Sequence, residues 1–390
     1  MTAPSVQKKW VIHGTKRGLD EYKLEQGPVA KPDGHQVLVK LHAAAINFRD
    51  IMIPRGEFPY SLNLPVVGGS DGAGEIVQVG DKVTKFKVGD RVAALFNPGH
   101  QFGSLDAVAM LRGGVGGTED GTFQEYGVYD ETGVVRLASN LSYIEGATLS
   151  DAAVTAWNAL YGGKPLKPGD WVLVQGTSGV SLFAVQFAKA GGARVVATTS
   201  SPAKFDVLKR LGADHVINYN DDQSWGLTAR SLTPGQAGFD NIIEVGGTDT
   251  MGHSIQAIKI EGTITVIGLV TGFDPPESIM ETLKRVFTLR GIHVGSKVQM
   301  EEMMACMEAN KIQPVVDKKI FALEELRESL EYLVSIFHRN LLHCRSSNVA
   351  SCMLMADVCR LLRNMWARSR SRSPRGLATP QLIISQGTPG

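Results

Sequence analysis

The chain has 390 residues, which is enough for two domains that each bury a hydrophobic core. Its 43% hydrophobic and 20% charged residues are typical of a soluble globular protein. Glycine is in excess, at 43 residues against a usual ~7%, but lacks the period of collagen. This composition indicates many tight turns, as in α/β and β-rich enzymes.

The net charge of +1 is unevenly distributed along the chain. Residues 336–390 contain eight Arg and one acidic residue and carry +7, so residues 1–335 carry −6. A mildly acidic body argues against nucleic acid as a partner. No apolar run reaches the ~18 residues of a membrane span, and the N-terminus lacks an apolar signal segment. With three of the four Cys in 336–390, no disulfide framework is expected, and a cytoplasmic setting is predicted.

Residues 1–150 are predicted to be rich in strands and turns. Apolar positions alternate in 37–43, and further strands are expected in 75–79 and 89–95. Turn signals such as Pro32-Asp-Gly separate these strands, whereas the Gly-rich segment 97–122 lacks a clear periodicity.

Residues 151–295 are predicted to alternate between helices and strands. A strand–helix alternation at this spacing is typical of a doubly wound parallel sheet. Strands are expected at 171–175, 194–199, 215–219, 239–245, 262–268 and 292–295, and helices at 151–161, 182–190 and 202–211.

The segment 296–335 is predicted to contain two helices, at 299–310 and 323–334. After Ser335 the pattern changes to Ser/Arg-rich sequence, which is typical of a disordered tail over 336–390.

A strand that enters a helix through Gly176-Thr-Ser-Gly-Val-Ser181 predicts a phosphate site. Gly176 and Gly179 let the backbone approach a pyrophosphate, and Thr177, Ser178 and Ser181 add hydroxyl groups at a positive helix end. The spacing differs from GxGxxG, so a plain tight turn is the alternative.

The end of the next strand distinguishes the two nicotinamide cofactors. An NAD site places a carboxylate about 20 residues after the glycine loop. Here no Asp or Glu lies between the glycine loop and Asp206. Ser200, Ser201 and Lys204 suit a 2′-phosphate, so NADPH is favoured. The alternative is that the serines cap the next helix and Lys204 is a surface charge.

Zinc is not expected. A structural zinc site needs about four Cys close together, and the first 305 residues contain none. His42 and His100 lack ligand spacing, so surface or hydrogen-bonded histidines are favoured over metal ligands.

Several motifs together resemble the zinc-free, quinone oxidoreductase-like branch of the medium-chain dehydrogenase/reductase superfamily over about residues 8–335. The resemblance implies an α/β fold with a GroES-like β-rich domain (1–150) and a Rossmann NADP-binding domain (151–295), followed by helices that return to the first domain (296–335). It implies a nicotinamide in the cleft between these domains. The motifs are Ala45-Ile-Asn-Phe-Arg-Asp-Ile, Arg55-Gly-Glu-Phe-Pro, Pro65-Val-Val-Gly-Gly-Ser-Asp-Gly-Ala-Gly-Glu, Leu166-Lys-Pro-Gly-Asp, Val174-Gln-Gly-Thr-Ser-Gly-Val-Ser and Leu211-Gly-Ala-Asp-His-Val-Ile-Asn-Tyr.

The same resemblance implies roles for individual residues. Asn47 and Thr155 would contact the nicotinamide. The loop Gly176–Ser181, which includes Val180, would bind the pyrophosphate. Asn47, Arg49 and Asp71 are the polar groups expected near the reacting end. The 2′-phosphate would lie among Ser200, Ser201, Lys204 and Tyr219, and the nicotinamide ribose among Val245, Ile267 and Gly268.

The sequence departs from the family at three places. Zinc-containing relatives carry Cys where Asn47 stands and His-Glu where Ser70-Asp71 stand. Related enoyl-thioester reductases use a Tyr as proton donor in the loop that here holds Phe58. Phe cannot donate a proton, so this mechanism is not expected here, and Tyr60 of this chain is the nearby substitute. The usual closing strand is replaced from Ile336 onward by the atypical tail.

Three functions follow as hypotheses. The first is NADPH-dependent hydride transfer to an activated double bond in a quinone, enone or enoyl substrate. The second is an NADP-dependent alcohol or carbonyl dehydrogenase, and the third is an inactive cofactor-binding protein with a basic interaction tail. A small-molecule substrate and a homodimer, built through the edge strand near 292–295, are expected.

Overall fold

The computed structural model describes residues 3–60, 62–107, 109, 114–268, 270–272 and 277–343. The chain divides into two compact units. Unit 1 contains Met1–Asp151 and Ser296–Val334, and unit 2 contains Ala152–Gly295.

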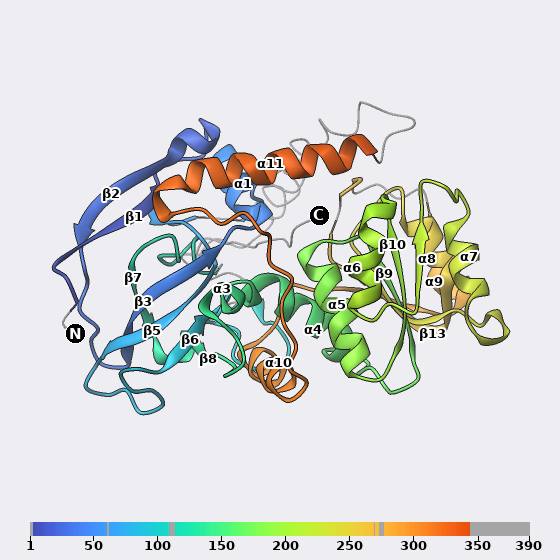
Figure 1. Cartoon of the computed structure of the whole chain (residues 1–390), viewed down its shortest axis with the longest axis horizontal. Helices are drawn as coiled ribbons and strands as arrows, with labels where there is room; N and C mark the ends of the chain where they lie inside the picture. Colours follow the sequence, from blue (N-terminus) through green and yellow to red (C-terminus); the bar gives the residue numbers. More distant parts are fainter. Residues whose placement is uncertain are drawn as a thin grey trace, which may run out of the picture. The chain divides into compact units, whose positions relative to one another are not determined.

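Unit 1 is built on two sheets (Figure 1). The smaller sheet has the order β2-β1-β4, and the larger sheet has the order β7-β3-β5-β6-β8. All pairs within both sheets are antiparallel, which fits the alternation of buried and exposed residues in the sequence. The strands are β1 (Val6–Ile12), β2 (Tyr22–Pro28), β3 (Gln36–Ala45), β4 (Val66–Val67), β5 (Asp71–Val79), β6 (Arg91–Ala94), β7 (Tyr126–Asp130) and β8 (Val134–Arg136).

The larger sheet of unit 1 buries a valine-rich core. Val37 and Val39 of β3 share a face of the sheet, and Val39 lies opposite Ile76 of β5. Val92 and Tyr129 complete this apolar layer from the neighbouring strands. Unit 1 is therefore rich in strands, as the strand pattern predicts and as the GroES-like domain implied by the resemblance requires.

The strand pattern of unit 1 did not predict helix α1 (Phe48–Arg55). This helix begins at Asn47, whose backbone N–H donates to Asp50 Oδ2 at 2.7 Å, and it ends at Gly56 with φ 69°. Pro54 lies in its last turn. Two further helical segments, α3 (Tyr143–Gly146) and the π-helical turn Leu149–Ala153, lead toward unit 2 along the chain.

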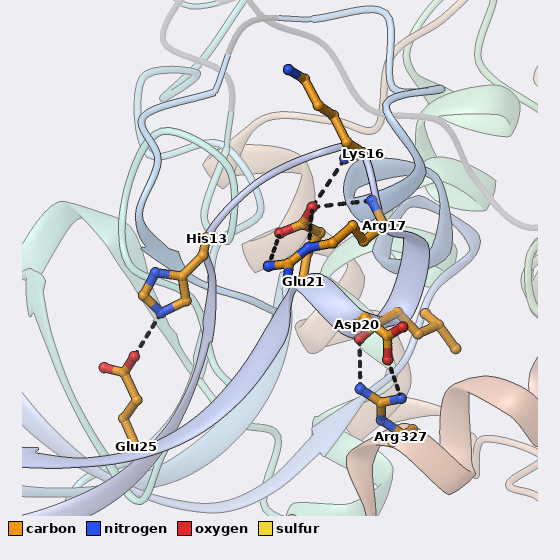
Figure 2. A network of polar contacts seen from close by, with 8 residues as sticks. His13, Lys16, Arg17, Asp20, Glu21, Glu25 and Arg327 are labelled. Atoms are coloured by element: carbon orange, nitrogen blue, oxygen red, sulfur yellow. Dashed lines mark hydrogen bonds and ion pairs between the residues drawn. The ribbon is translucent and has the colours of Figure 1, made fainter.

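Unit 1 also contains α10 (Lys297–Ala309) and the part of α11 (Leu326–His343) that ends at Val334. At the start of α11, Arg327 donates to Asp20 Oδ1 at 2.6 Å and to the Leu19 carbonyl at 3.2 Å (Figure 2). Nearby, Trp10 Nε1 donates to the Leu323 carbonyl at 2.6 Å. These contacts attach the segment around the start of α11 to β1 and to the turn before β2.

Unit 2 is a six-stranded parallel sheet of order β11-β10-β9-β12-β13-β14. Helices cover both of its faces, with α5 and α6 on one side and α7 and α8 on the other (Figure 1). The strands are β9 (Trp171–Gln175), β10 (Arg194–Thr199), β11 (His215–Asn218), β12 (Phe239–Glu244), β13 (Ile258–Val266) and β14 (Thr288–Gly291). The helices are α4 (Val154–Tyr161), α5 (Gly179–Ala190), α6 (Phe205–Arg210), α7 (Trp225–Ser231), α8 (Met251–Ala257) and α9 (Glu281–Arg285).

Two predicted elements differ from the structure. The strand expected at 292–295 is wrong, because the edge strand is β14 at Thr288–Gly291. Helix α11 continues to His343, past its predicted end at Val334, because amphipathic spacing extends into the first residues of the expected tail. The rest of that tail, 344–390, lies outside the described residues.

Candidate functional site

The strand order of unit 2 reverses direction between β9 and β12, which are neighbours in the sheet. Chain connections leave these two strands toward opposite sides, so their carboxyl ends leave a crevice at this switch point. Ligands of open α/β sheets bind in that position. The loops that follow β9, β10, β11, β12 and β13 therefore form the candidate cofactor site.

The loop after β9 connects directly into helix α5. Gly176 has φ 71°, a conformation that glycine adopts without strain, and Ser178 is the N-cap of the 12-residue helix. Ser178 Oγ accepts from the Ser181 amide at 3.2 Å, while Ser181 Oγ donates to the Gln175 carbonyl at 2.7 Å. The two buried hydroxyls therefore shape the loop, and the remaining amides at the helix start are suited to an anion.

A polar group forms where β10 and β11 end. Ser200 and Ser201 follow β10, and Tyr219 follows β11, with its amide donating to the Thr199 carbonyl at 3.1 Å. Asn220 Nδ2 donates to the Ser200 carbonyl at 2.9 Å, which fixes the two strand ends together. Lys204 ends the short 3-10 turn Pro202–Lys204 that follows the serines. The structure thus brings together the residues predicted to surround a 2′-phosphate.

The ends of β12 and β13 are also joined by backbone hydrogen bonds. The amides of Ile267 and Gly268 donate to the Glu244 carbonyl at 2.9 and 3.4 Å. Gly268 lies so close to β12 that a Cβ on it would come 2.6 Å from the Val245 carbonyl oxygen. Val245 itself is 8% exposed. These three predicted residues therefore occupy one edge of unit 2 together with the phosphate loop.

Thr155 lies on α4, also in unit 2. Its side chain is buried, and its hydroxyl has no hydrogen-bond partner among the described residues. A buried hydroxyl without a partner is costly, so this group is available to a ligand.

In unit 1, Ser70 joins Asn47 and Asp71, two of the three polar residues predicted to lie near the reacting end, in one hydrogen-bonded line. Asn47 Nδ2 donates to Ser70 Oγ at 3.2 Å, and Ser70 Oγ donates to Asp71 Oδ1 at 2.6 Å. Asp71 Oδ2 accepts from the amide of Asp151 at 3.0 Å. All four residues are buried.

Three aspartates of unit 1 are buried close to one another. Burial raises the pKa of Asp71 to about 7 and that of Asp50 to about 6. Burial, followed by the neighbouring Asp71, raises the pKa of Asp151 well above its ordinary value, and both Asp151 oxygens lack partners among the described residues. At least part of this group is therefore neutral near pH 7.

Arg49 is the guanidinium beside these carboxyls, and it is 1% exposed. Its Cζ lies 5.4 Å from the ring centroid of Phe58 and 5.3 Å from that of Phe96. Its Nη1 donates to the Val115 carbonyl at 3.0 Å and lies 3.8 Å from Asp50 Oδ1. Arg49 therefore stabilises the buried cluster, and Phe58, where related reductases place a tyrosine, packs against it.

Family models match both units of the chain. The alcohol dehydrogenase GroES-like domain matches residues 33–139, and the zinc-binding dehydrogenase model matches residues 179–309. A zinc-type alcohol dehydrogenase-like protein of Schizosaccharomyces pombe is 44% identical over 337 residues, which cover 85% of this chain and 96% of that protein. The chain belongs to the medium-chain dehydrogenase/reductase family.

Solved structures agree with this family. A candidate alcohol dehydrogenase from Sinorhizobium meliloti has a TM-score of 0.79 and 33% identity, covering 87% of this chain and 97% of that one. An NAD-dependent alcohol dehydrogenase has a TM-score of 0.70 and 31% identity, covering 79% and 91%. As a medium-chain dehydrogenase/reductase, the chain is an oxidoreductase, and its cofactor is a nicotinamide dinucleotide.

Zinc, which binds to some members of the medium-chain family, does not suit the residues present here. Asn47 and Ser70 offer an amide and a hydroxyl that are already bonded to each other, and both Asp71 oxygens accept hydrogen bonds. Zinc sites use thiolate, imidazole and carboxylate ligands. His42 stacks on Tyr143, and among the described residues no group of three His, Cys, Asp or Glu could hold a metal.

Sequence reasoning did not identify Asp151, Asn220 or Glu244. Asp151 and Asp71 are 80 residues apart in the sequence, so no local pattern joins them. Asn220 directly follows a predicted strand, and this position was the one available signal for it.

In the described part of the chain, no helix is long and apolar enough to cross a membrane.

Proposed function

We propose that this chain is an NADPH-dependent oxidoreductase that transfers hydride to an activated carbon–carbon double bond, as in a quinone, enone or enoyl ester, without zinc. The observation that carries the proposal is the hydrogen-bonded line Asn47–Ser70–Asp71, in the place where zinc-containing relatives carry their ligands. NADPH, when bound, supplies the hydride.

The polar groups of this line suit a conjugated substrate better than an isolated carbonyl. An amide and a hydroxyl can polarise a carbonyl oxygen only by hydrogen bonding, since they carry no Lewis-acid charge. Hydride addition to a conjugated double bond places the developing charge on an enolate oxygen, which hydrogen-bond donors stabilise. The carboxyl of Asp71, with a pKa of about 7, is a source of the proton that completes the reduction.

The preference for NADPH is supported by the ends of β10 and β11. Hydroxyls of Ser200 and Ser201 lie there with Lys204 and the amide of Asn220. No Asp or Glu lies between the glycine loop and Asp206. A carboxylate there would accept from ribose hydroxyls and would repel a 2′-phosphate.

Steady-state assays of the full chain with NADPH test the proposal. The panel contains enones, quinones and an enoyl thioester beside simple aldehydes and secondary alcohols. We expect turnover of the conjugated substrates, unchanged after dialysis against a chelator of divalent metals. Inactivity of a folded, NADPH-binding protein on every conjugated substrate would refute the proposal.

A second candidate is an NADP-dependent alcohol or carbonyl dehydrogenase, and the names of the relatives, which refer to alcohol dehydrogenases, favour this type of reaction. Turnover confined to aldehydes and secondary alcohols would establish it in place of the first. The third hypothesis, an inactive cofactor-binding protein, requires nucleotide binding without turnover of any substrate. Its basic tail lies outside the described residues, and peptide mass mapping of the native protein would show whether that tail is translated.

A further inference from the structure

Glu244 is a buried carboxylate at the carboxyl end of β12, beside the switch point of the unit 2 sheet. It is 0% exposed, and it belongs neither to the Asn47–Ser70–Asp71 line nor to the loop after β9. A carboxylate buried to this extent is stable only when donors occupy its oxygens. Its partners therefore indicate what this residue holds in place.

The first oxygen of Glu244 organises the loop that follows β12. Oε1 accepts from the amides of Gly246 and Gly247 at 2.9 and 3.0 Å and from the Thr250 hydroxyl at 2.5 Å. Three donors from one short segment thus converge on one atom. The loop conformation from Val245 to Thr250 depends on that atom.

The second oxygen connects the same loop to β9 and α8. Oε2 accepts from Gln175 Nε2 at 2.7 Å and from the hydroxyl of Ser254. Gln175 Oε1 in turn accepts from the amides of Val245 and Gly246 at 3.2 and 3.3 Å. Gln175 and Glu244 therefore fix the backbone on the β9 side of this loop by complementary bonds.

Gln175 also belongs to the phosphate loop. Its backbone carbonyl accepts from Ser181 Oγ at 2.7 Å, and Gly176 follows it directly. One residue thus joins the loop after β9 to the loop after β12. These are the two loops that flank the crevice at the switch point.

We infer that Glu244, acting through Gln175, is the positioning residue that sets the phosphate loop and the Val245–Thr250 loop in register for a dinucleotide. The inference rests on the proposed cofactor site but concerns a residue that is not among those proposed to contact the cofactor. A carboxylate is required, because the side-chain amide of a glutamine at 244 would place an N–H donor either against Gln175 Nε2 or against the backbone amides of Gly246 and Gly247, which are donors themselves.

The test compares Glu244→Gln with the exchange variant Glu244→Gln/Gln175→Glu. In the exchange variant the carboxylate of residue 175 accepts from the side-chain amide of residue 244. Each N–H and O–H group around the two side chains then has an acceptor again. Asp240→Asn is the matched control: Asp240 lies on the same strand, at the opposite end, and accepts from the Trp171 amide at 2.9 Å and Lys259 Nζ at 2.6 Å. Each variant is measured for its NADPH dissociation constant, its melting temperature and the amide hydrogen exchange of residues 244–250.

We expect Glu244→Gln to raise the NADPH dissociation constant at least tenfold and to accelerate exchange in 244–250. The exchange variant should restore the wild-type dissociation constant and exchange rate. Asp240→Asn should leave both at the wild-type level, even if its melting temperature falls as much as that of Glu244→Gln. An unchanged dissociation constant in folded Glu244→Gln, or no recovery in the exchange variant, would overturn the inference. If the wild-type chain bound neither NADPH nor NADH, the proposed function would fail, and amide exchange alone would then decide whether Glu244 positions the loop.

Discussion

At the scale of single residues, the chemistry of this chain depends on where charge is buried. Asp71, Asp50 and Asp151 are carboxyls that burial keeps partly neutral, whereas Glu244 is surrounded by donors. Burial thus raises the pKa of the carboxyls in unit 1, whereas in unit 2 the Glu244 carboxyl accepts five hydrogen bonds. The difference lies in the number of N–H and O–H groups directed at each carboxyl.

The raised pKa of Asp71 predicts a pH dependence of stability. Its folded pKa of about 7 lies above its unfolded value of about 4, so the native state binds the extra proton. The contribution of this proton to the free energy of unfolding is fully present below about pH 4. It is lost as the pH rises through 7, by at most ~1.4 kcal/mol per pH unit. Relative to Asp71→Asn, the wild-type melting temperature should therefore fall between pH 5 and pH 8.

Asp214 provides the opposite control for that experiment. Although burial opposes it, hydrogen bonds from the Val195 amide, Lys189 and Arg194 lower the pKa of Asp214 to about 2. Its stabilisation is present above about pH 4 and is lost only as the pH falls toward 2. The melting-temperature difference between wild type and Asp214→Asn should stay constant from pH 5 to pH 8. A constant difference for Asp71→Asn as well would contradict the raised pKa.

Lys204 is predicted to select the phosphorylated cofactor. Lys204→Ala removes a cation from the end of the β10 loop and should weaken NADPH binding about tenfold, equivalent to ~1.4 kcal/mol, while leaving NADH binding nearly unchanged. Fluorescence titration with both nucleotides measures this difference. Lys209→Ala is the control, because Lys209 lies on α6, the helix that follows Lys204, and donates to the Asp214 carbonyl. Equal weakening of both nucleotides would remove the basis for NADPH preference.

At the scale of elements, close packing between the ends of β12 and β13 leaves no room for a side chain at 268. A Cβ on Gly268 would meet the Val245 carbonyl at 2.6 Å, so Gly268→Ala must displace one strand end. We expect a loss of about 1–3 kcal/mol of stability and weaker nucleotide binding. At Gly291, which ends β14, a Cβ would meet no atom within 4 Å, so Gly291→Ala should change stability by less than about 0.5 kcal/mol. Thermal denaturation and nucleotide titration of both variants check this contrast, which equal effects would contradict.

At the scale of the whole molecule, the edge of the unit 2 sheet is predicted to form a homodimer. Within the described residues, β14 pairs with β13 alone, and exposed apolar side chains lie just before it and on it. An open strand edge next to an apolar patch favours pairing with a second copy. The side chains, with exposed fractions from 44% to 76%, are Ile279, Met280, Leu283, Val286 and Leu289.

Leu283→Asp should shift the assembly toward monomer, because it places a charge in the expected interface. Leu227→Asp is the control, since Leu227 is 54% exposed on α7 and lies outside this patch. Sedimentation velocity of the wild type and both variants measures the mass of the assembly. A monomeric wild type, or equal effects of the two changes, would place the assembly elsewhere or exclude it.

The sequence by itself determined that unit 2 is a parallel α/β sheet and where a glycine-containing loop joins β9 to α5. Strands β9 and β10 lie where they were predicted, because their apolar runs are fully buried in a parallel sheet and are bounded by turn residues. Gly176 and Ser178 were identified for the same local reason: a strand that turns into a helix needs these residue types in the turn itself.

Only the tertiary structure decided which polar groups meet. Helix α1 and the position of β14 were not predicted, because packing against distant segments outweighs local preference there. The continuation of α11 was missed although its amphipathic spacing extends past Val334. The contact of Asp151 with Asp71 and the bonds of Glu244 to Gln175 likewise join residues that are 80 and 69 positions apart. Periodicity describes which face of an element is buried, whereas the partner of a buried carboxyl depends on how separate elements come together.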